Sequence, residues 1–166
     1  MTGYTHLSAG ALAGAVIGRL AGEPLLGAAV GAVAALLPDI DHPGSLVGRR
    51  VPVLPALLSV ITGHRTVTHT VWFCLAVAAG AGVLAVSLAG WAWAWLSAPT
   101  FCGALSHLLL DGCTRSGVRP FAPLPMRGKL ARVEHVQGPL VTGDPLTEVP
   151  VALLALAAAA WAAGLV

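Results

Sequence analysis

The chain has 166 residues, of which 57% are hydrophobic and only 10% are charged, and its formal net charge is +2. A soluble domain typically has about 45–50% apolar and about 25% charged residues, so this composition excludes an ordinary soluble domain. The small charge, with no run of basic residues, gives no reason to expect a nucleic-acid partner. The length predicts a single domain over residues 1–166.

Apolar segments separated by turns and polar stretches predict an all-α, polytopic membrane bundle of about five helices. In chain order they cover about Thr5–Leu20, Pro24–Leu37, Thr70–Ala89, a segment that begins between Trp91 and Pro99 and ends at Asp111, and a last segment from near Pro150 to the C-terminus. The first two are short, because about 14–16 residues extend only about 21–24 Å as helix, whereas a full span needs about 20 residues. Residues 39–68 and 112–149 are predicted to be two long loops.

Small residues recur every fourth position in the first two segments. They are Gly10, Gly14 and Gly18 in the first, and Gly27, Gly31 and Ala35 in the second. Such stripes allow helix backbones to approach closely in lipid, so we expect these two helices to pack tightly against each other.

The polar residues stand at alternating ends of the apolar segments. If each segment crosses the membrane once, one face receives His6, Asp39, Asp41, His42, His64, His69, His107, Asp111, Glu134, His135, Asp144 and Glu148. Ionisable groups at a membrane edge are costly and are candidates for function. Asp144, between Gly143 and Pro145, is expected to be a solvated loop residue.

The basic residues are distributed unequally between the two faces. Arg19 alone falls on the far face, and the other eight Lys and Arg residues fall on the face with the polar residues. Because short cytoplasmic loops are enriched in Lys and Arg, we expect the polar face and both long loops to be cytoplasmic.

Two short motifs have the residue types of a metal site. His107 and Asp111 are four residues apart, so they share one face of a helix and could hold one ion, although a structural His–Asp pair fits this spacing equally well. Asp39-Ile40-Asp41-His42 follows Pro38. One carboxylate could be a ligand while the other acts as general base; the alternative is a polar turn in which Asp caps its own backbone.

A third motif, His64-Arg65-Thr66-Val67-Thr68-His69, precedes the third apolar segment. Thr68 could cap that helix and place His69 in its first turn. Arg65 could orient a carboxylate or clamp an anionic substrate such as a phosphate, or it could instead anchor the chain at the membrane surface.

The combined donors are nitrogen and oxygen without cysteine, which favours Zn²⁺, Mn²⁺ or Fe²⁺ over Mg²⁺ or a closed structural zinc site. A metal with an open position lowers the pKa of bound water to about 7 and makes it a nucleophile. Hydrolysis is the expected chemistry of such a site.

The same motifs resemble the YdjM-like family of bacterial inner-membrane proteins, which are described as metal-dependent hydrolases. The matching pieces are Thr5-His6, Leu37-Pro38-Asp39-Ile40-Asp41-His42-Pro43 with Ser45, His64-Arg65 with Thr68-His69-Thr70, and His107 with Asp111, Thr114 and Gly117. Thr66 departs from the glycine expected after His-Arg. The resemblance implies a helical inner-membrane protein with a metal centre of His and Asp. By ligand order alone, the set is also similar to helical zinc phospholipases C and nucleases, which implies phosphoester cleavage.

We therefore expect a membrane-embedded metal-dependent hydrolase, acting on a lipid-like phosphoester at the cytoplasmic face of a bacterial inner membrane. The expected metal ligands are His6, Asp39, His64, His69, His107 and Asp111, and the expected catalytic residues are Asp41 and Arg65. The alternative is a metal-binding membrane scaffold or transporter without enzymatic activity. The almost purely apolar helix centres disfavour a transporter, which needs polar groups through the depth of the bilayer.

Overall fold

Five α-helices and two short 3₁₀ helices make up the fold of this computed structural model, which describes residues 1–50, 67–125 and 133–165. The α-helices are α1 (Gly3–Leu20), α2 (Pro24–Ala34), α4 (Val71–Ala89), α5 (Ser97–Gly112) and α6 (Pro145–Ala162), and the 3₁₀ helices are η1 (Pro38–Asp41) and η2 (Trp91–Leu96). The described residues contain no strand, and the predicted all-α class is confirmed.

Two helix ends differ from the sequence prediction. Helix α2 ends at Ala34 rather than Leu37, because Pro38 has no N–H to continue the ladder and begins η1 instead. Helix α6 begins at Pro145 rather than near Pro150, with Pro150 inside the helix. Asp144 caps it by accepting a hydrogen bond from Leu146 N, and a proline at the first helical position loses no helix bond.

The start of α4 also differs from the prediction. Thr70, not Thr68, is the cap, because its Oγ1 accepts a hydrogen bond from Phe73 N. His69 therefore lies just before the helix, not in its first turn. The hydroxyl of Thr68 is left to contact side chains of the candidate site.

Helices α1 and α2 are in backbone contact along their glycines, as the small-residue stripes predict. A Cβ atom on Gly14 would lie 2.0 Å from the carbonyl oxygen of Gly27, and one on Gly31 would lie 2.3 Å from the carbonyl oxygen of Gly10. Helix α5 approaches the same place, since a Cβ on Gly103 would lie 2.3 Å from Gly31 O. This close approach brings three helix ends within side-chain reach of one another.

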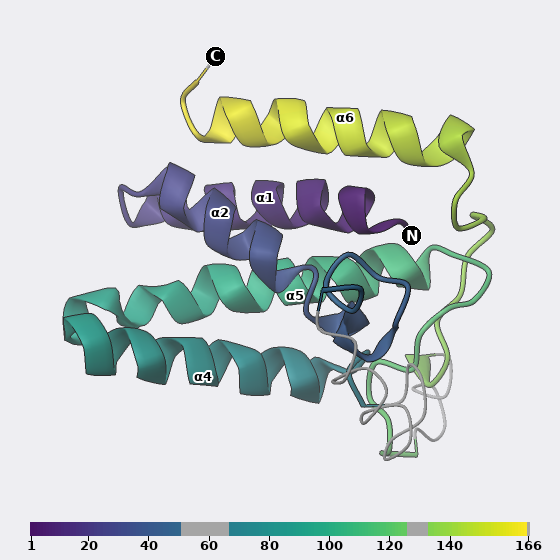
Figure 1. Cartoon of the computed structure of the whole chain (residues 1–166), viewed down its shortest axis with the longest axis horizontal. Helices are drawn as coiled ribbons and strands as arrows, with labels where there is room; N and C mark the ends of the chain where they lie inside the picture. Colours follow the sequence, from purple (N-terminus) through teal and green to yellow (C-terminus); the bar gives the residue numbers. More distant parts are fainter. Residues whose placement is uncertain (51–66, 126–132, 166) are drawn as a thin grey trace.

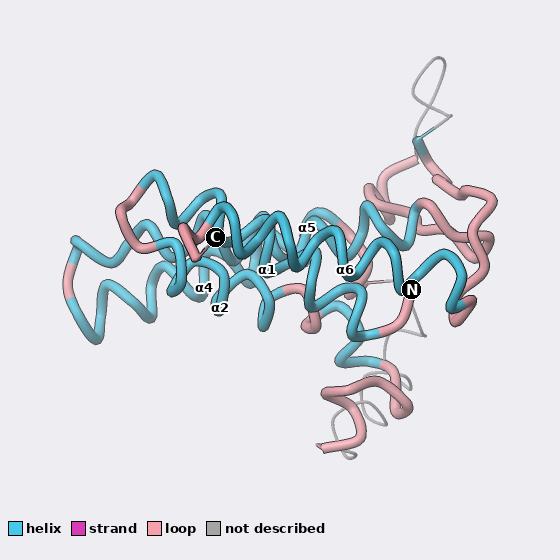
Figure 2. The backbone as a smooth tube through the Cα atoms, turned by 90° about the horizontal axis from the view of Figure 1, so that it is seen from above, coloured by secondary structure: helices cyan, strands magenta, loops and turns pink. Residues whose placement is uncertain are grey.

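Helix α1 packs against α2, α5 and α6, and α4 packs against α5. Successive helices run in opposite directions, so the N-terminus, the end of α2, the start of α4, the end of α5 and the start of α6 gather at one end of the bundle (Figure 1). Most of the loops lie at this end, while short turns close the other (Figure 2). We call these the loop end and the turn end.

Three described stretches are long and apolar enough to cross a membrane: Pro24–Asp41, which runs from α2 through η1, and helices α4 and α6. Large apolar side chains such as Leu84 and Leu88 on α4, and Leu153 and Leu154 on α6, are exposed on the bundle surface, as lipid contact requires. Helices α1 and α5 pack among the others and carry three of the candidate site residues: His6 on α1, and His107 and Asp111 on α5. At the turn end, Trp91 and Trp161 are exposed in the manner of an interfacial aromatic belt.

Candidate metal centre

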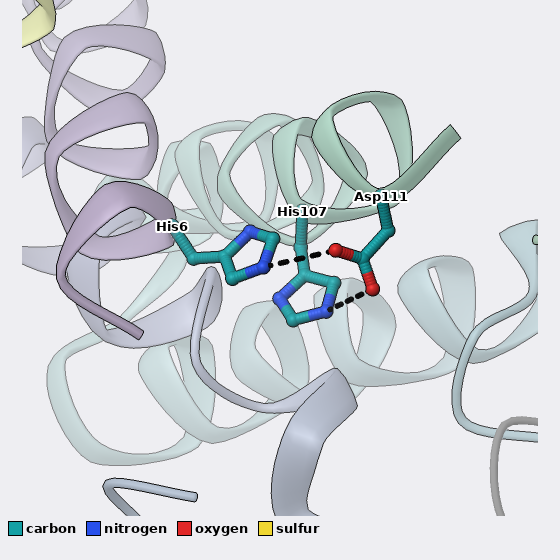
Figure 3. Close-up of side chains that lie close together, drawn as sticks. All are labelled: His6, His107 and Asp111. Atoms are coloured by element: carbon teal, nitrogen blue, oxygen red, sulfur yellow. Dashed lines mark ion pairs between the residues drawn. The ribbon is translucent and has the colours of Figure 1, made fainter. Parts of the chain in front are cut away.

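His107 and Asp111 lie one turn apart on α5 and are both fully buried. From α1, the ring of His6 stacks on that of His107, with centroids 3.6 Å apart and planes 14° from parallel. Figure 3 shows these three side chains pointing toward one another, with ion pairs joining both histidines to Asp111. The HxxxD spacing therefore forms part of a buried cluster between two helices.

Asp39 of η1 and His69, which precedes α4, complete the cluster. Asp39 Oδ1 lies 3.5 Å from His69 Nε2 and 3.6 Å from His107 Nε2. Asp111 Oδ2 lies 3.7 Å from His69 Nε2 and 3.6 Å from His107 Nε2. The two Nε2 atoms are 3.3 Å apart. Four potential ligand atoms from three separate parts of the chain thus surround one point.

The spacing of these four atoms matches a tetrahedral metal site. Metal–nitrogen and metal–oxygen bonds of about 2.0–2.2 Å give a tetrahedron with edges of about 3.3–3.6 Å. Five of its six edges are the distances above, which range from 3.3 to 3.7 Å. The set has two imidazole nitrogens and two carboxylate oxygens, a combination that suits a divalent transition metal.

Backbone contacts fix the tautomer of His107. Its Nδ1 lies 2.8 Å from the carbonyl oxygen of Ala35, and a carbonyl can only accept, so Nδ1 carries the proton. Ala35 follows the last residue of α2, and the final carbonyls of a helix have no partner within it. The Nε2 lone pair of His107 therefore faces the cluster.

The tautomer of His69 is set by hydrogen bonds that link its ring to Thr68 and Thr68 to Asp41. Thr68 Oγ1 donates to Asp41 Oδ2 at 3.0 Å and lies 3.0 Å from His69 Nδ1. A hydroxyl has one proton, so Thr68 accepts from the Nδ1–H of His69, whose Nε2 is left as a ligand. Burial also lowers the pKa of His69, although the nearby carboxylate of Asp39 opposes this. A neutral imidazole, the form that binds metals, is favoured.

The second oxygen of Asp111 faces α1. Asp111 Oδ1 lies 3.2 Å from His6 Nε2 and also forms an ion pair with the amino group of Met1. His6, His107 and Asp111 together could hold an ion, as could Asp39, His69 and His107. His107 belongs to both groups but has one free lone pair, so only one of them can use it at a time.

Glu148 anchors the start of α1 beside the cluster. This buried carboxylate of α6 accepts hydrogen bonds from Thr2 N at 2.8 Å, Thr5 Oγ1 at 2.8 Å and Gly143 N at 2.7 Å, and from the Thr2 hydroxyl. Thr5 immediately precedes His6. The sequence placed Glu148 at the same end of the bundle as the cluster but gave it no role. The Asp-Pro start of α6 was the signal that could have placed it in the first turns of that helix.

The structure brings together five of the predicted ligands: His6, Asp39, His69, His107 and Asp111. His64 and Arg65 lie outside the described residues. Asp41 is buried but belongs to neither ligand group, and it lies behind His69, joined to it through Thr68. The predicted role of Asp41 as a base or bridging ligand therefore does not fit its position.

The remaining polar residues of the loop end stand apart from the cluster. His42 is exposed and its Nδ1 accepts from Gly44 N, and Glu134 and His135 are exposed. Asp144 is not a loop residue without a fixed partner, because it caps α6.

An open cleft of about 360 Å³ adjoins the cluster at Asp39. Its walls include Met1, Thr2, His42, Ser45 and Arg49. Asp39 is the one member of the five-residue cluster that is more than about 1% exposed, with 19% of its side chain accessible. The cleft, which we call the Asp39 cleft, is thus the side from which a small molecule meets the cluster.

The comparisons with known proteins agree with the membrane architecture. The family model described as "YdjM inner membrane protein" matches residues 1–166. The protein YvsG of Bacillus subtilis is 36% identical over 131 residues, which cover 78% of each chain. The inner membrane protein YdjM of Escherichia coli is 34% identical over 103 residues, 57% of this chain and 48% of that protein, and YdjM of Shigella flexneri matches equally.

The matched part of the chain thus spans about half the length of the YdjM proteins. No solved structure matches. The full-length family match, together with helices that are long and apolar enough to cross a bilayer, shows that this chain belongs to the YdjM family of inner membrane proteins.

Proposed function

We propose that this protein is a membrane-embedded, metal-dependent hydrolase that cleaves a phosphoester of a lipid-like substrate. The observation that carries the proposal is the near-tetrahedral set of Asp39, His69, His107 and Asp111, with spacings of 3.3 to 3.7 Å. A purely structural pair of His107 and Asp111 would not require Asp39 and His69 beside it. Nor would it require the tautomers that direct both Nε2 lone pairs to one point.

The residues present fit a divalent metal, and zinc fits them best because it prefers tetrahedral nitrogen and oxygen ligands, with manganese and iron as further candidates. His69, His107 and Asp111 would hold the ion throughout, and Asp39, which borders the cleft, would be the ligand that gives its place to water. When bound, such a metal supplies Lewis acidity and an activated water at neutral pH. His6 holds the other oxygen of Asp111 and so fixes the orientation of that carboxylate.

The proton-accepting group is best assigned to Asp39. A general base must reach the water that it deprotonates, and Asp39 lines the cleft whereas Asp41 does not. We assign Asp41 a positioning role instead: it receives the hydrogen bond of Thr68, which orients His69. Arg65 remains a candidate for substrate binding from outside the described residues.

The site faces the cytoplasm in this proposal. Among the described residues, Arg49, Arg50, Arg115 and Arg119 follow helices that end at the loop end, while Arg19 lies at the turn end. Such a bias in short loops is typical of the cytoplasmic side of inner-membrane proteins. The substrate would therefore be a phosphoester at the inner leaflet.

The proposal is tested with the purified chain in detergent, loaded with zinc and assayed on bis(p-nitrophenyl) phosphate and on a short-chain phospholipid. We expect hydrolysis that a chelator abolishes, that zinc restores and that Asp39→Asn removes, with Asp144→Asn as the matched control at the same end of the bundle. Metal binding without hydrolysis of any phosphoester would favour the alternative, a metal-binding membrane scaffold.

A further inference from the structure

An apolar groove adjoins the Asp39 cleft. The groove encloses about 440 Å³ and is lined by Tyr4, Leu7, Leu36, Leu46, Val47 and Arg50. Tyr4 and Leu46 also line the cleft. We call this the Tyr4 groove. The polar Asp39 cleft and the apolar Tyr4 groove thus share part of their walls.

The groove lies where the apolar stretch Pro24–Asp41 reaches the loop end. Leu7 is on α1, and Leu36 follows α2 within the apolar stretch Pro24–Asp41. A soluble substrate would need no apolar channel leading away from the cluster. An acyl chain entering from the inner leaflet would find one directly beside the site.

One arginine lines each of these two cavities. Arg49 lines the cleft, and its Nε donates to Ser45 O at 3.4 Å. Arg50 lines the groove, and its Nη1 donates to Leu46 O at 2.6 Å. Each of these bonds holds an arginine to its own turn. Because a guanidinium has five N–H donors, each arginine keeps further donors for an anion. Asp39 is the acidic residue of the cleft wall, and the proposed metal neutralises it.

We propose that the cleft and the groove together bind one anionic phospholipid. Its phosphate lies in the Asp39 cleft under Arg49, and one acyl chain lies in the Tyr4 groove along Leu7 and Leu36. This inference rests on the proposed function and names its substrate class as a membrane phosphate ester whose headgroup is small enough to enter the cleft. Charge complementarity selects the anion, and the position of an apolar groove beside a polar cleft, with Tyr4 and Leu46 shared between them, selects an amphiphile.

The occupant is tested by photocrosslinking. The full chain is placed in phosphatidylcholine nanodiscs with a small fraction of phosphatidic acid that carries a diazirine on one acyl chain, and the adducts are mapped by mass spectrometry. We expect adducts concentrated at Leu7, Leu36 and Val47. Leu7→Trp should fill the groove and reduce them at least about tenfold, while Leu20→Trp, on the exposed turn end of the same helix, should not. Adducts spread over α4 and α6 and insensitive to Leu7→Trp would overturn the proposal.

The anion contact is tested in the same system. Because a charge-assisted hydrogen bond is roughly twice as strong as a neutral one, Arg49→Gln should reduce the phosphatidic acid adducts about tenfold. The matched diacylglycerol probe should be unaffected, and Arg115→Gln is the control at the same end of the bundle. Glycerol 3-phosphate added at the same concentration should not compete; if it does, the site takes a small anion and not a lipid.

Experiments on the metal-free protein and on the His107→Ala variant distinguish a failure of this inference from a failure of the proposed function. Adduct formation needs no catalysis, and the diacylglycerol probe has no phosphate for Asp39 to repel, so its Leu7 adducts should persist in both. Adducts without hydrolysis in any metal-loaded sample would contradict the enzyme and leave the lipid site standing. Hydrolysis without groove adducts would contradict the lipid site alone.

Discussion

His69 and His107 direct their Nε2 atoms at each other across 3.3 Å, and the Nδ1 contacts of the two rings assign a lone pair to each Nε2. Each ring donates its Nδ1 proton elsewhere, to Thr68 and to Ala35 O respectively. Two lone pairs at this distance repel unless a cation lies beside both. The pair is thus preorganised to hold a cation, and the following predictions test this.

Asp111→Asn should weaken zinc binding far more than Asp144→Asn. Loss of a residue that only supports a ligand typically costs about 10–100-fold in metal affinity, so loss of a carboxylate ligand should cost at least that. Asp144 caps α6, and asparagine caps a helix about as well as aspartate, so its variant should stay within a few-fold of the wild type. Isothermal titration in detergent measures both. Equal losses would show that Asp111 is not a ligand.

The purified protein should hold one metal ion per chain. The groups His6–His107–Asp111 and Asp39–His69–His107 share His107, and its single available lone pair can serve one ion. Elemental analysis after removal of loosely bound metal gives the ratio. A ratio of two would contradict the single-ion arrangement and would make His6 a direct ligand.

Thr68→Val should reduce metal affinity about 10–100-fold, even though Thr68 touches no metal. Valine keeps the shape but removes the hydroxyl that orients His69 and accepts its Nδ1 proton. Thr68→Ser should restore most of the affinity, which a merely steric role would not explain. Thr100→Val is the control, because its buried hydroxyl donates to the backbone of Leu96. An unchanged affinity in Thr68→Val would remove the proposed orienting role.

Glu148→Ala should destabilise the protein by at least about 3 kcal/mol, because hydrogen bonds to a charged group contribute about 1.5–3 kcal/mol each and several donors lose their partner together. It should also weaken metal binding, since the start of α1 carries His6. Thermal unfolding and zinc titration in detergent measure the two effects. Glu134→Ala, an exposed loop carboxylate, is the control. Identical melting of the two variants would contradict the anchoring role of Glu148.

Cys113 reports the orientation of the loop end. It is exposed directly after α5, whereas Cys74 is buried. With the loop end in the cytoplasm, a membrane-impermeant maleimide should label Cys113 only after the cells are opened, and Cys113→Ser should lose that label. Labelling of Cys113 in intact cells would reverse the proposed topology.

Local rules account for much of what the sequence determined. Apolar length and proline positions indicated the helices, and the spacing of four residues placed His107 and Asp111 on one face of α5. The alternation of apolar segments brought Asp39, His69 and His6 to the same end of the bundle. Each of these inferences depends on neighbours in the chain or on the number of helices between two residues, and both can be counted from the sequence.

Tertiary packing alone decided which donor each acceptor meets. Asp39 and Asp41 are equivalent by sequence, yet the turn of η1 directs Asp39 to the two Nε2 atoms and Asp41 to Thr68. Glu148 contacts Thr2 and Thr5 across more than 140 residues of chain because α6 packs on α1. Such partners depend on the axial offset and rotation of packed helices. A small change in the offset or rotation of a helix exchanges one hydrogen-bond partner for another without changing the hydrophobic pattern of either helix.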